Sequence, residues 1–175
     1  AAGFPSAPIV DEFDRPDGAL GGAWVGDIAG LAIQDGELIQ HAPDDWGIWD
    51  GGVFGPDQEV YVTIVQMTPG APEHDLMLKV QGLSWADGEI EVRYDDTVPG
   101  VVVSTYTPGD GWQARAAPIP VTLHAGDVFG ARRAGAAKFV GARRGDRHPG
   151  LREKQACDRM PRHPHRDRRA TDSDF

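Results

Sequence analysis

Apolar and polar residues alternate with a period of two along three consecutive stretches in the middle of the chain. The stretches cover residues 59–67, 75–82 and 88–96. Their alternating apolar positions are Val60, Val62 and Ile64, then Leu76, Leu78 and Val80, then Ile90, Val92 and Tyr94. A period of two is typical of strands that have one buried and one wet face. Because loops rich in Pro, Gly, Asp and His separate the stretches, the pattern predicts antiparallel sheet rather than βαβ units.

Shorter strand-like segments flank this central region. Residues 31–40 read as a hairpin, with Asp35 and Gly36 forming the turn between two apolar strands. Further strands are expected in residues 46–54, 101–107, 112–116, 121–123 and 128–132. These segments bring the total to about ten short strands at the spacing expected of a β-sandwich. No segment before residue 135 has a helical period, so the sequence predicts an all-β protein.

Charge divides the chain into two unequal parts. Residues 1–135 contain 6 Lys and Arg against 21 Asp and Glu, a net charge of −15, whereas residues 136–175 contain 11 against 6, a net charge of +5. An acidic body repels nucleic acid and anionic membrane surfaces. No apolar run approaches the roughly 18 residues of a membrane-spanning helix. We therefore expect neither a nucleic-acid nor a membrane partner, and the composition suits Ca²⁺ or neutral sugars.

Composition also predicts three segments along the chain. Residues 1–10 are rich in Pro and Ala and are expected to form a linker. Residues 11–133 carry the alternating pattern and form the sandwich. Residues 134–175 are dense in Arg, His, Pro and Asp, lack alternation, and are expected to be a disordered basic tail without strands. We expect this tail to be an out-of-frame ending, because GC-rich DNA read out of frame yields Arg, Pro and Gly.

Five stretches, in consistent order, carry a resemblance to a known family. They are DEFDRPDGALGGAW at 11–24, FGPDQEVYVTI at 54–64, LMLKVQG at 76–82, IEVRYD at 90–95 and IPVTLHAGDVFGAR at 119–132. Together they resemble concanavalin A-like lectin/glucanase domains of bacterial secreted and phage tail proteins. The resemblance implies an antiparallel jelly-roll β-sandwich and a secreted or virion-surface location. Because residues 134–175 depart from the family's closing strands, the sandwich is expected to lack its last strands.

The family includes lectins, adhesion modules, laminin-G-like domains and glycoside hydrolases, so its fold does not define one activity. Laminarinase-type members carry three acids at alternate positions of one strand, two of which serve as nucleophile and acid/base. In this sequence Glu89, Glu91 and Asp95 alternate along one strand, but Arg93 takes the place of the third acid. A retaining mechanism also needs its two carboxyls about 5–5.5 Å apart. We therefore favour a solvated strand face with cross-strand ion pairs, and Glu89, Glu91 and Asp95 are the catalytic candidates if the protein is an enzyme.

Three tryptophans are candidates for stacking against sugar rings. Trp85 and Trp112 both lie near Gly-containing loops, where ligand sites concentrate, and Trp46 is the third candidate. The alternative is that such residues pack in the core, and this is the interpretation preferred for Trp24 and Trp49.

No metal motif is present at the level of sequence. Most Asp residues in the loops are turn formers. Related sandwiches hold a structural Ca²⁺ beside the first strand, and that resemblance would implicate Glu12 or Asp14 as ligands. No other cofactor is expected.

These observations favour a non-catalytic carbohydrate-binding or adhesion module of a larger secreted or virion protein. The alternatives are a glycoside hydrolase or polysaccharide lyase of the glucanase type, and a structural spacer domain that has no ligand.

Overall fold

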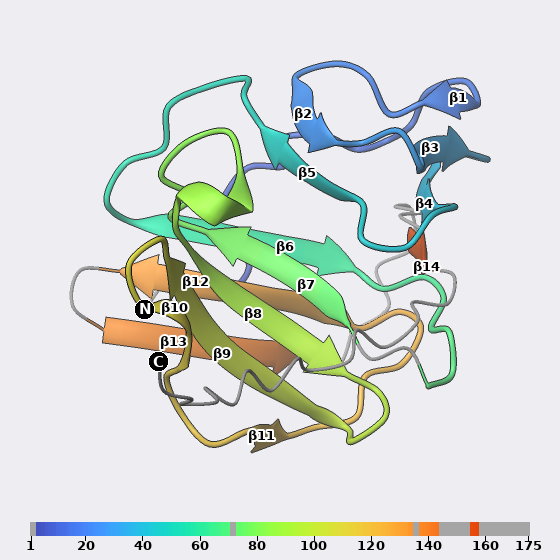
Figure 1. The fold of residues 1–175 in the computed structure, drawn as a ribbon. Coiled ribbons are helices and arrows are strands. Elements are labelled where there is room, and N and C mark those ends of the chain that lie inside the picture. The colour runs from blue at the N-terminus through green and yellow to red at the C-terminus, as the bar shows by residue number, and fades with distance from the viewer. Residues whose placement is uncertain (1–2, 71–72, 135–136, 144–154, 158–175) are drawn as a thin grey trace, which may run out of the picture.

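The structure is a computed structural model that describes residues 3–70, 73–134, 137–143 and 155–157. Within these residues the protein is all-β, as predicted, and its strands pair antiparallel with one exception (Figure 1). The one described helix is a single 3₁₀ turn, η1 (Trp85–Asp87). No helix in this part of the chain is long and apolar enough to cross a membrane.

Two larger sheets form the body of the molecule. The first has the order β10-β9-β8-β7, with β11 also pairing with β9, and the second has the order β13-β12-β6. The strands of the first sheet are β7 (His74–Leu78), β8 (Glu89–Asp95), β9 (Gly100–Thr107), β10 (Gly111–Ala114) and β11 (Ile119–Pro120). Those of the second are β6 (Gln58–Thr63), β12 (Val128–Ala134) and β13 (Ala137–Arg143).

Smaller strands lie beside this body, at the top of the view in Figure 1. They form a sheet of order β1-β3-β4-β14 and a separate pair, β2 with β5. Their bounds are β1 (Gly18–Ala19), β2 (Trp24–Asp27), β3 (Leu31–Gln34), β4 (Glu37–Gln40), β5 (Trp46–Trp49) and β14 (Gln155–Cys157). The hairpin predicted at residues 31–40 is β3–β4, and Asp35 and Gly36 both adopt positive φ in its turn.

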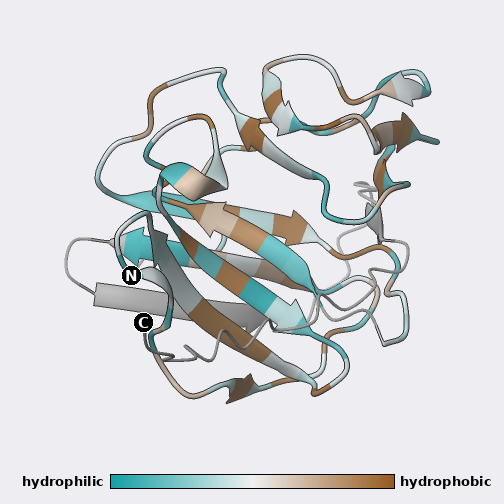
Figure 2. Cartoon of the chain, viewed as in Figure 1, coloured by the Kyte–Doolittle hydropathy of each residue, from teal (hydrophilic) through white to brown (hydrophobic). Residues whose placement is uncertain are grey.

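The main core lies between the two larger sheets. On β8, Val92 and Tyr94 are buried and Ile90 packs against the same cluster, whereas the intervening positions lie on the other face. The second sheet contributes Phe129 and Ala131 to this cluster. Figure 2 shows the same alternation of hydrophobic and hydrophilic residues along the strands of the first sheet. Because both sheets bury side chains in one core, they pack face to face as a two-layer β-sandwich.

A second, smaller core supports the strands at the top of the molecule. Leu20, Leu31 and Ile33 are buried there, and Trp24 packs against them. The indole Nε1–H of Trp24 donates a hydrogen bond to Asp11 at 2.8 Å. Trp24 is therefore a packing residue, which agrees with the interpretation preferred from the sequence.

Two segments differ from what composition predicts. Strands were not expected after residue 134, yet β13 pairs with β12 and β14 pairs in parallel with β4, so that expectation is wrong for residues 137–143 and 155–157. The remainder of the predicted tail, residues 144–154 and 158–175, lies outside the described residues. Pairing with a strand already in place supplies backbone hydrogen bonds that a count of apolar residues ignores.

The N-terminal segment, expected to be a linker, contacts the second sheet over its described residues. The carboxylate of Glu59 in β6 accepts hydrogen bonds from the backbone N–H groups of Ser6 and Ala7. Tyr61 in the same strand donates its hydroxyl hydrogen to the carbonyl of Ala7 at 2.9 Å. The segment is thereby tied to β6.

Candidate functional site

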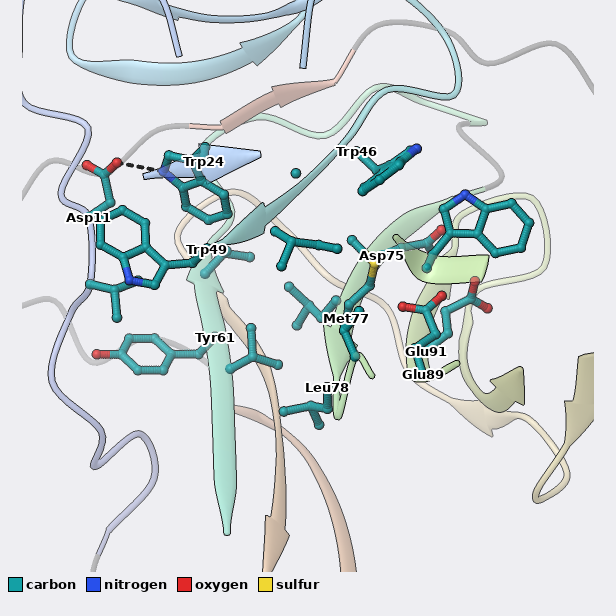
Figure 3. Close-up of a pocket in the computed structure, with 18 of the residues that line it drawn as sticks. Asp11, Trp24, Trp46, Trp49, Tyr61, Asp75, Met77, Leu78, Glu89 and Glu91 are labelled. Carbon is teal, nitrogen blue, oxygen red and sulfur yellow. Dashed lines mark hydrogen bonds between the residues drawn. The ribbon is translucent and has the colours of Figure 1, made fainter. Parts of the chain in front are cut away.

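A hollow of about 1400 Å³ follows β7, the edge strand of the first sheet. It is lined by Leu76 and Leu78 from the core face of β7 and by Asp75 and Met77 from the opposite face. The hollow therefore passes around this strand from the core to the outer face of the sheet. In Figure 3, Asp75, Glu89 and Glu91 lie together on one side of the hollow, and Tyr61 lies on the other.

Strand β8 brings two carboxyl groups to the outer face. Because alternate residues point to opposite faces, burying Ile90, Val92 and Tyr94 turns the polar side chains between them away from the core. Glu89 and Glu91 both line the hollow. Antiparallel pairing adds further groups from the neighbouring strands, since Met77 lies opposite Glu91 and Asp75 lies opposite Arg93.

Glu89 is the most enclosed of these acids. Its side chain is only 6% exposed, and Oε2 has no hydrogen-bond partner among the described residues. Burial, followed by the negative charge of Glu91, raises the pKa of Glu89 from 4.5 to about 8. A buried carboxyl with an unpaired oxygen is costly unless something satisfies it, so this group favours a ligand or a proton.

The neighbouring acids are perturbed in the same direction. Burial and the charge of Glu73 raise the pKa of Glu91, although the charge of Arg93 opposes them. The side chain of Asp75 is exposed at the surface, and it lines the hollow. Desolvation by the neighbouring protein atoms, followed by the charges of Glu91 and Glu73, raises the pKa of Asp75 above its usual range. When ionised, the three carboxyls therefore repel one another, and this repulsion disfavours the state in which all three are charged.

Arg93 offsets the charge of this group only in part. Its Nη1 donates to Glu73 Oε1 at 2.8 Å, an ion pair in which both side chains are about one-third exposed. An ion pair of the kind expected on this face is thus present at Arg93, and Glu89 takes no part in it.

An aromatic cluster borders the acids. Trp85 and Trp112 lie with their ring centroids 6.0 Å apart and their planes 19° from parallel. The Tyr106 ring completes a triangle with them, because its centroid is 5.1 Å from each of the two tryptophan centroids. Trp112 is 45% exposed, whereas Trp85 is half-buried. The three rings form one aromatic cluster, called here the aromatic platform (Trp85, Tyr106 and Trp112), in which Tyr106 is edge-on to Trp85.

Local turns place the two tryptophans. The hydroxyl of Ser84 accepts a hydrogen bond from the N–H of Ala86 and so caps η1, which begins with Trp85. Trp112 follows Gly111, whose φ of +67° in the β9–β10 turn lies in the region that favours glycine. Register then places Trp112 directly opposite Tyr106.

The structure brings together most of the residues singled out in the sequence. Glu89, Glu91, Trp46, Trp85 and Trp112 all line the one hollow. In Figure 3, Trp46 extends from β5 toward the side of the hollow where Asp75 lies.

Three of the candidates lie elsewhere. Asp95 stands at the end of β8, where its Oδ1 accepts a hydrogen bond from the N–H of Thr97 at 2.8 Å, so it is a turn former. Glu12 and Asp14 are exposed and lie outside the hollow. Within the described ranges, no group of three or more His, Cys, Asp or Glu side chains is arranged to hold a metal ion.

Two contributors were not singled out from the sequence. Asp75 enters the site because it lies opposite Arg93, and Tyr106 because its ring contacts both Trp85 and Trp112. The alternation of residues 75–80 places Asp75 on the polar face of its strand, and this was the sequence feature that could have indicated its position beside the acids of β8. No local pattern indicated that Tyr106 would join the two tryptophans.

The fold and the hollow define an all-β protein of antiparallel sheets that has an acidic and aromatic recess on one sheet face. A scan against protein-family models, a search of curated proteins and a search of solved structures each found no match to this chain.

Proposed function

We propose that this protein is a carbohydrate-binding domain that uses the aromatic platform and the adjoining carboxyls of the hollow. The observation that carries the proposal is the nearly parallel pair Trp85 and Trp112, held beside Glu89 and Glu91 in a recess. Sugar rings present apolar C–H faces and polar edges. An aromatic surface next to hydrogen-bonding carboxyls matches both features.

The proposal agrees with the resemblance to concanavalin A-like domains, which is carried by the sequence stretches described above. In that interpretation the outer face of the β7–β10 sheet is the ligand face, and the two-layer sandwich is its scaffold. A spacer domain without ligand would have no reason to keep a buried, unpaired carboxyl beside three clustered aromatic rings.

Replacing Trp112 with alanine should weaken binding to a recognised glycan at least tenfold, because truncating a tryptophan that anchors a ligand typically costs about 2 kcal/mol or more. A glycan array identifies the ligand, and isothermal titration calorimetry then compares the variant with the wild type. Ile119→Ala is a matched control, because Ile119 is about as exposed as Trp112 but lies outside the hollow. Unchanged affinity in Trp112→Ala would refute the proposed site.

A second candidate function is glycoside hydrolysis. It is favoured by one observation: Glu89, with its pKa raised to about 8, is a carboxyl that stays protonated near neutral pH, and Glu91 lies two residues further along the same strand face. A protonated and an ionised carboxyl on one face are the pair that a glycosidase needs.

This candidate predicts release of reducing ends from the glycan that the array identifies. Release should fall by at least a thousandfold in Glu91→Gln, because removing a catalytic nucleophile or base leaves only binding to assist the reaction. The absence of release by the wild-type protein, together with intact binding, would leave the non-catalytic proposal alone.

A further inference from the structure

The hollow is lined mainly by acidic side chains, and this charge bears on whether its ligand is an acidic, neutral or basic sugar. Nine of the side chains that line it are Asp or Glu, whereas Lys79 and Arg93 are the only Lys or Arg among them. Arg93 pairs with Glu73 through Nη1, although its Nε has no partner among the described residues, and the Nζ of Lys79 donates to the carbonyl oxygens of Gly55 and Pro56. The hollow therefore repels acidic sugars and attracts cations.

Strand register places the most enclosed acid beside the stacking surface. Glu89 of β8 lies opposite Tyr106 of β9, and Tyr106 lies opposite Trp112 of β10, so the three form one row across the sheet. Residues that pair directly across antiparallel strands share a face. Neighbouring strands are about 4.8 Å apart, so Glu89 and Trp112 are separated by about 10 Å along this row. A pyranose ring stacked on the platform would direct a ring substituent toward Glu89.

We propose that the sugar bound here carries a free, protonated amine, which is received by Glu89 and its neighbours Glu91 and Asp75 while the ring stacks on the aromatic platform. The ligand class is thus a glycan that contains hexosamine residues with unsubstituted amino groups. This inference rests on the proposed carbohydrate-binding function and specifies its ligand.

Three features support an amine rather than another cation. Glu89 is more than nine-tenths buried, and its Oε2 has no partner among the described residues, so it offers a free acceptor. An ammonium group supplies three donors, which can serve several carboxyl oxygens at once. The same part of the chain contains no cluster fit for a metal ion, and aromatic faces add a cation–π attraction for ammonium groups.

The charged groups that face Glu89 are known from each neighbouring element. Glu91 and Arg93 lie on its own strand, Asp75 on β7 and Glu73 just before it, and the residues paired with β8 from β9 include no charged side chain. Glu89 and Asp75 have raised pKa values in the absence of ligand. A bound ammonium group would favour the ionised carboxyls, so binding should release protons.

The test is calorimetric titration at pH 6.5 with three hexamers: β-1,4-linked glucosamine, its N-acetylated counterpart and the matching glucose oligomer. We expect the glucosamine hexamer to bind at least tenfold more tightly than the other two. Titrations in two buffers with different ionisation enthalpies should show net proton release for the glucosamine hexamer and none for the neutral hexamers.

Two variants separate this site from general attraction between an acidic protein and a polycation. Glu89→Gln should abolish both the preference and the proton release while it retains binding of the neutral hexamers. Asp14→Asn removes one negative charge at an exposed position outside the hollow and should leave both unchanged. Circular dichroism checks that each variant is folded.

The possible failures are distinguishable. Equal affinity for all three hexamers would overturn the amine proposal and leave the carbohydrate-binding function standing. The amine proposal would also be overturned if Glu89→Gln and Asp14→Asn lowered the preference equally, or if neither lowered it. Either result would indicate non-specific attraction between an acidic protein and a polycation. If none of the hexamers binds, the amine proposal fails. The Trp112→Ala comparison with the ligand from the glycan array then tests the carbohydrate-binding function separately.

Discussion

Replacing Glu89 with glutamine is expected to flatten the pH dependence of stability by about 1 kcal/mol per pH unit between about pH 5 and pH 8. Burial, followed by the charge of Glu91, raises the pKa of Glu89 from 4.5 to about 8. In this interval the folded protein holds a proton on Glu89 that the unfolded chain has released. The stabilisation is complete below pH 4.5 and is lost as the pH rises through 8.

Urea denaturation at a series of pH values measures this effect as the change in the free energy of unfolding. The wild-type protein should lose stability across the interval, and Glu89→Gln should lose less. Asp14→Asn is the control, because it makes the same carboxyl-to-amide change at an exposed site outside the hollow. A slope in Glu89→Gln identical to that of the wild type would show that Glu89 does not titrate differently in the folded and unfolded states.

Replacing Glu59 with glutamine should cost about 3 kcal/mol of stability, the cost typical of breaking a buried ion pair. The carboxylate side chain is only 6% exposed, and it accepts hydrogen bonds from the N–H groups of Ser6 and Ala7 and from the guanidinium of Arg132. Burial alone would raise the pKa of Glu59, but these hydrogen bonds lower it overall. The charged form is thus the stable one. The substitution removes the negative charge and replaces one of the two acceptor oxygens, such as the Oε2 that faces Arg132, with an NH2 donor.

Denaturant unfolding at pH 7 provides the measurement. The matched control is Glu73→Gln, which breaks the more exposed Arg93–Glu73 pair and should cost less than about 1 kcal/mol. Equal losses in the two variants would contradict the role assigned to Glu59. The expected difference also tests whether residues 3–10 belong to the folded body, because Glu59 is the main group that holds them.

The sequence predicted the strands of the first sheet well for a specific reason. Strands β7 and β8 each bury one face in a single core, so their apolar positions must recur with a period of two. The same pattern placed Glu89 and Glu91 on the opposite, polar face. It placed Asp95 there too, but Asp95 lies at the strand end, where an adjacent turn uses its carboxylate.

Other features were not readable from local pattern. Strands β13 and β14 lie in sequence that is poor in apolar residues, and they are held by pairing with β12 and β4. Sheet pairing joins residues that are distant in the chain, so composition within one segment does not reveal it.

The sequence by itself determined the all-β class, the face of β8 that carries its acids, and the tryptophans available for stacking, because alternation and turn residues act over a few neighbouring positions. Only the tertiary structure decided that Glu89, Tyr106 and Trp112 form one row and that Asp75 joins the acids. Strand register made that decision, since it depends on how the whole core packs. Register also enclosed Glu89 in the hollow, and the charge and ligand preferences proposed here follow from that enclosure.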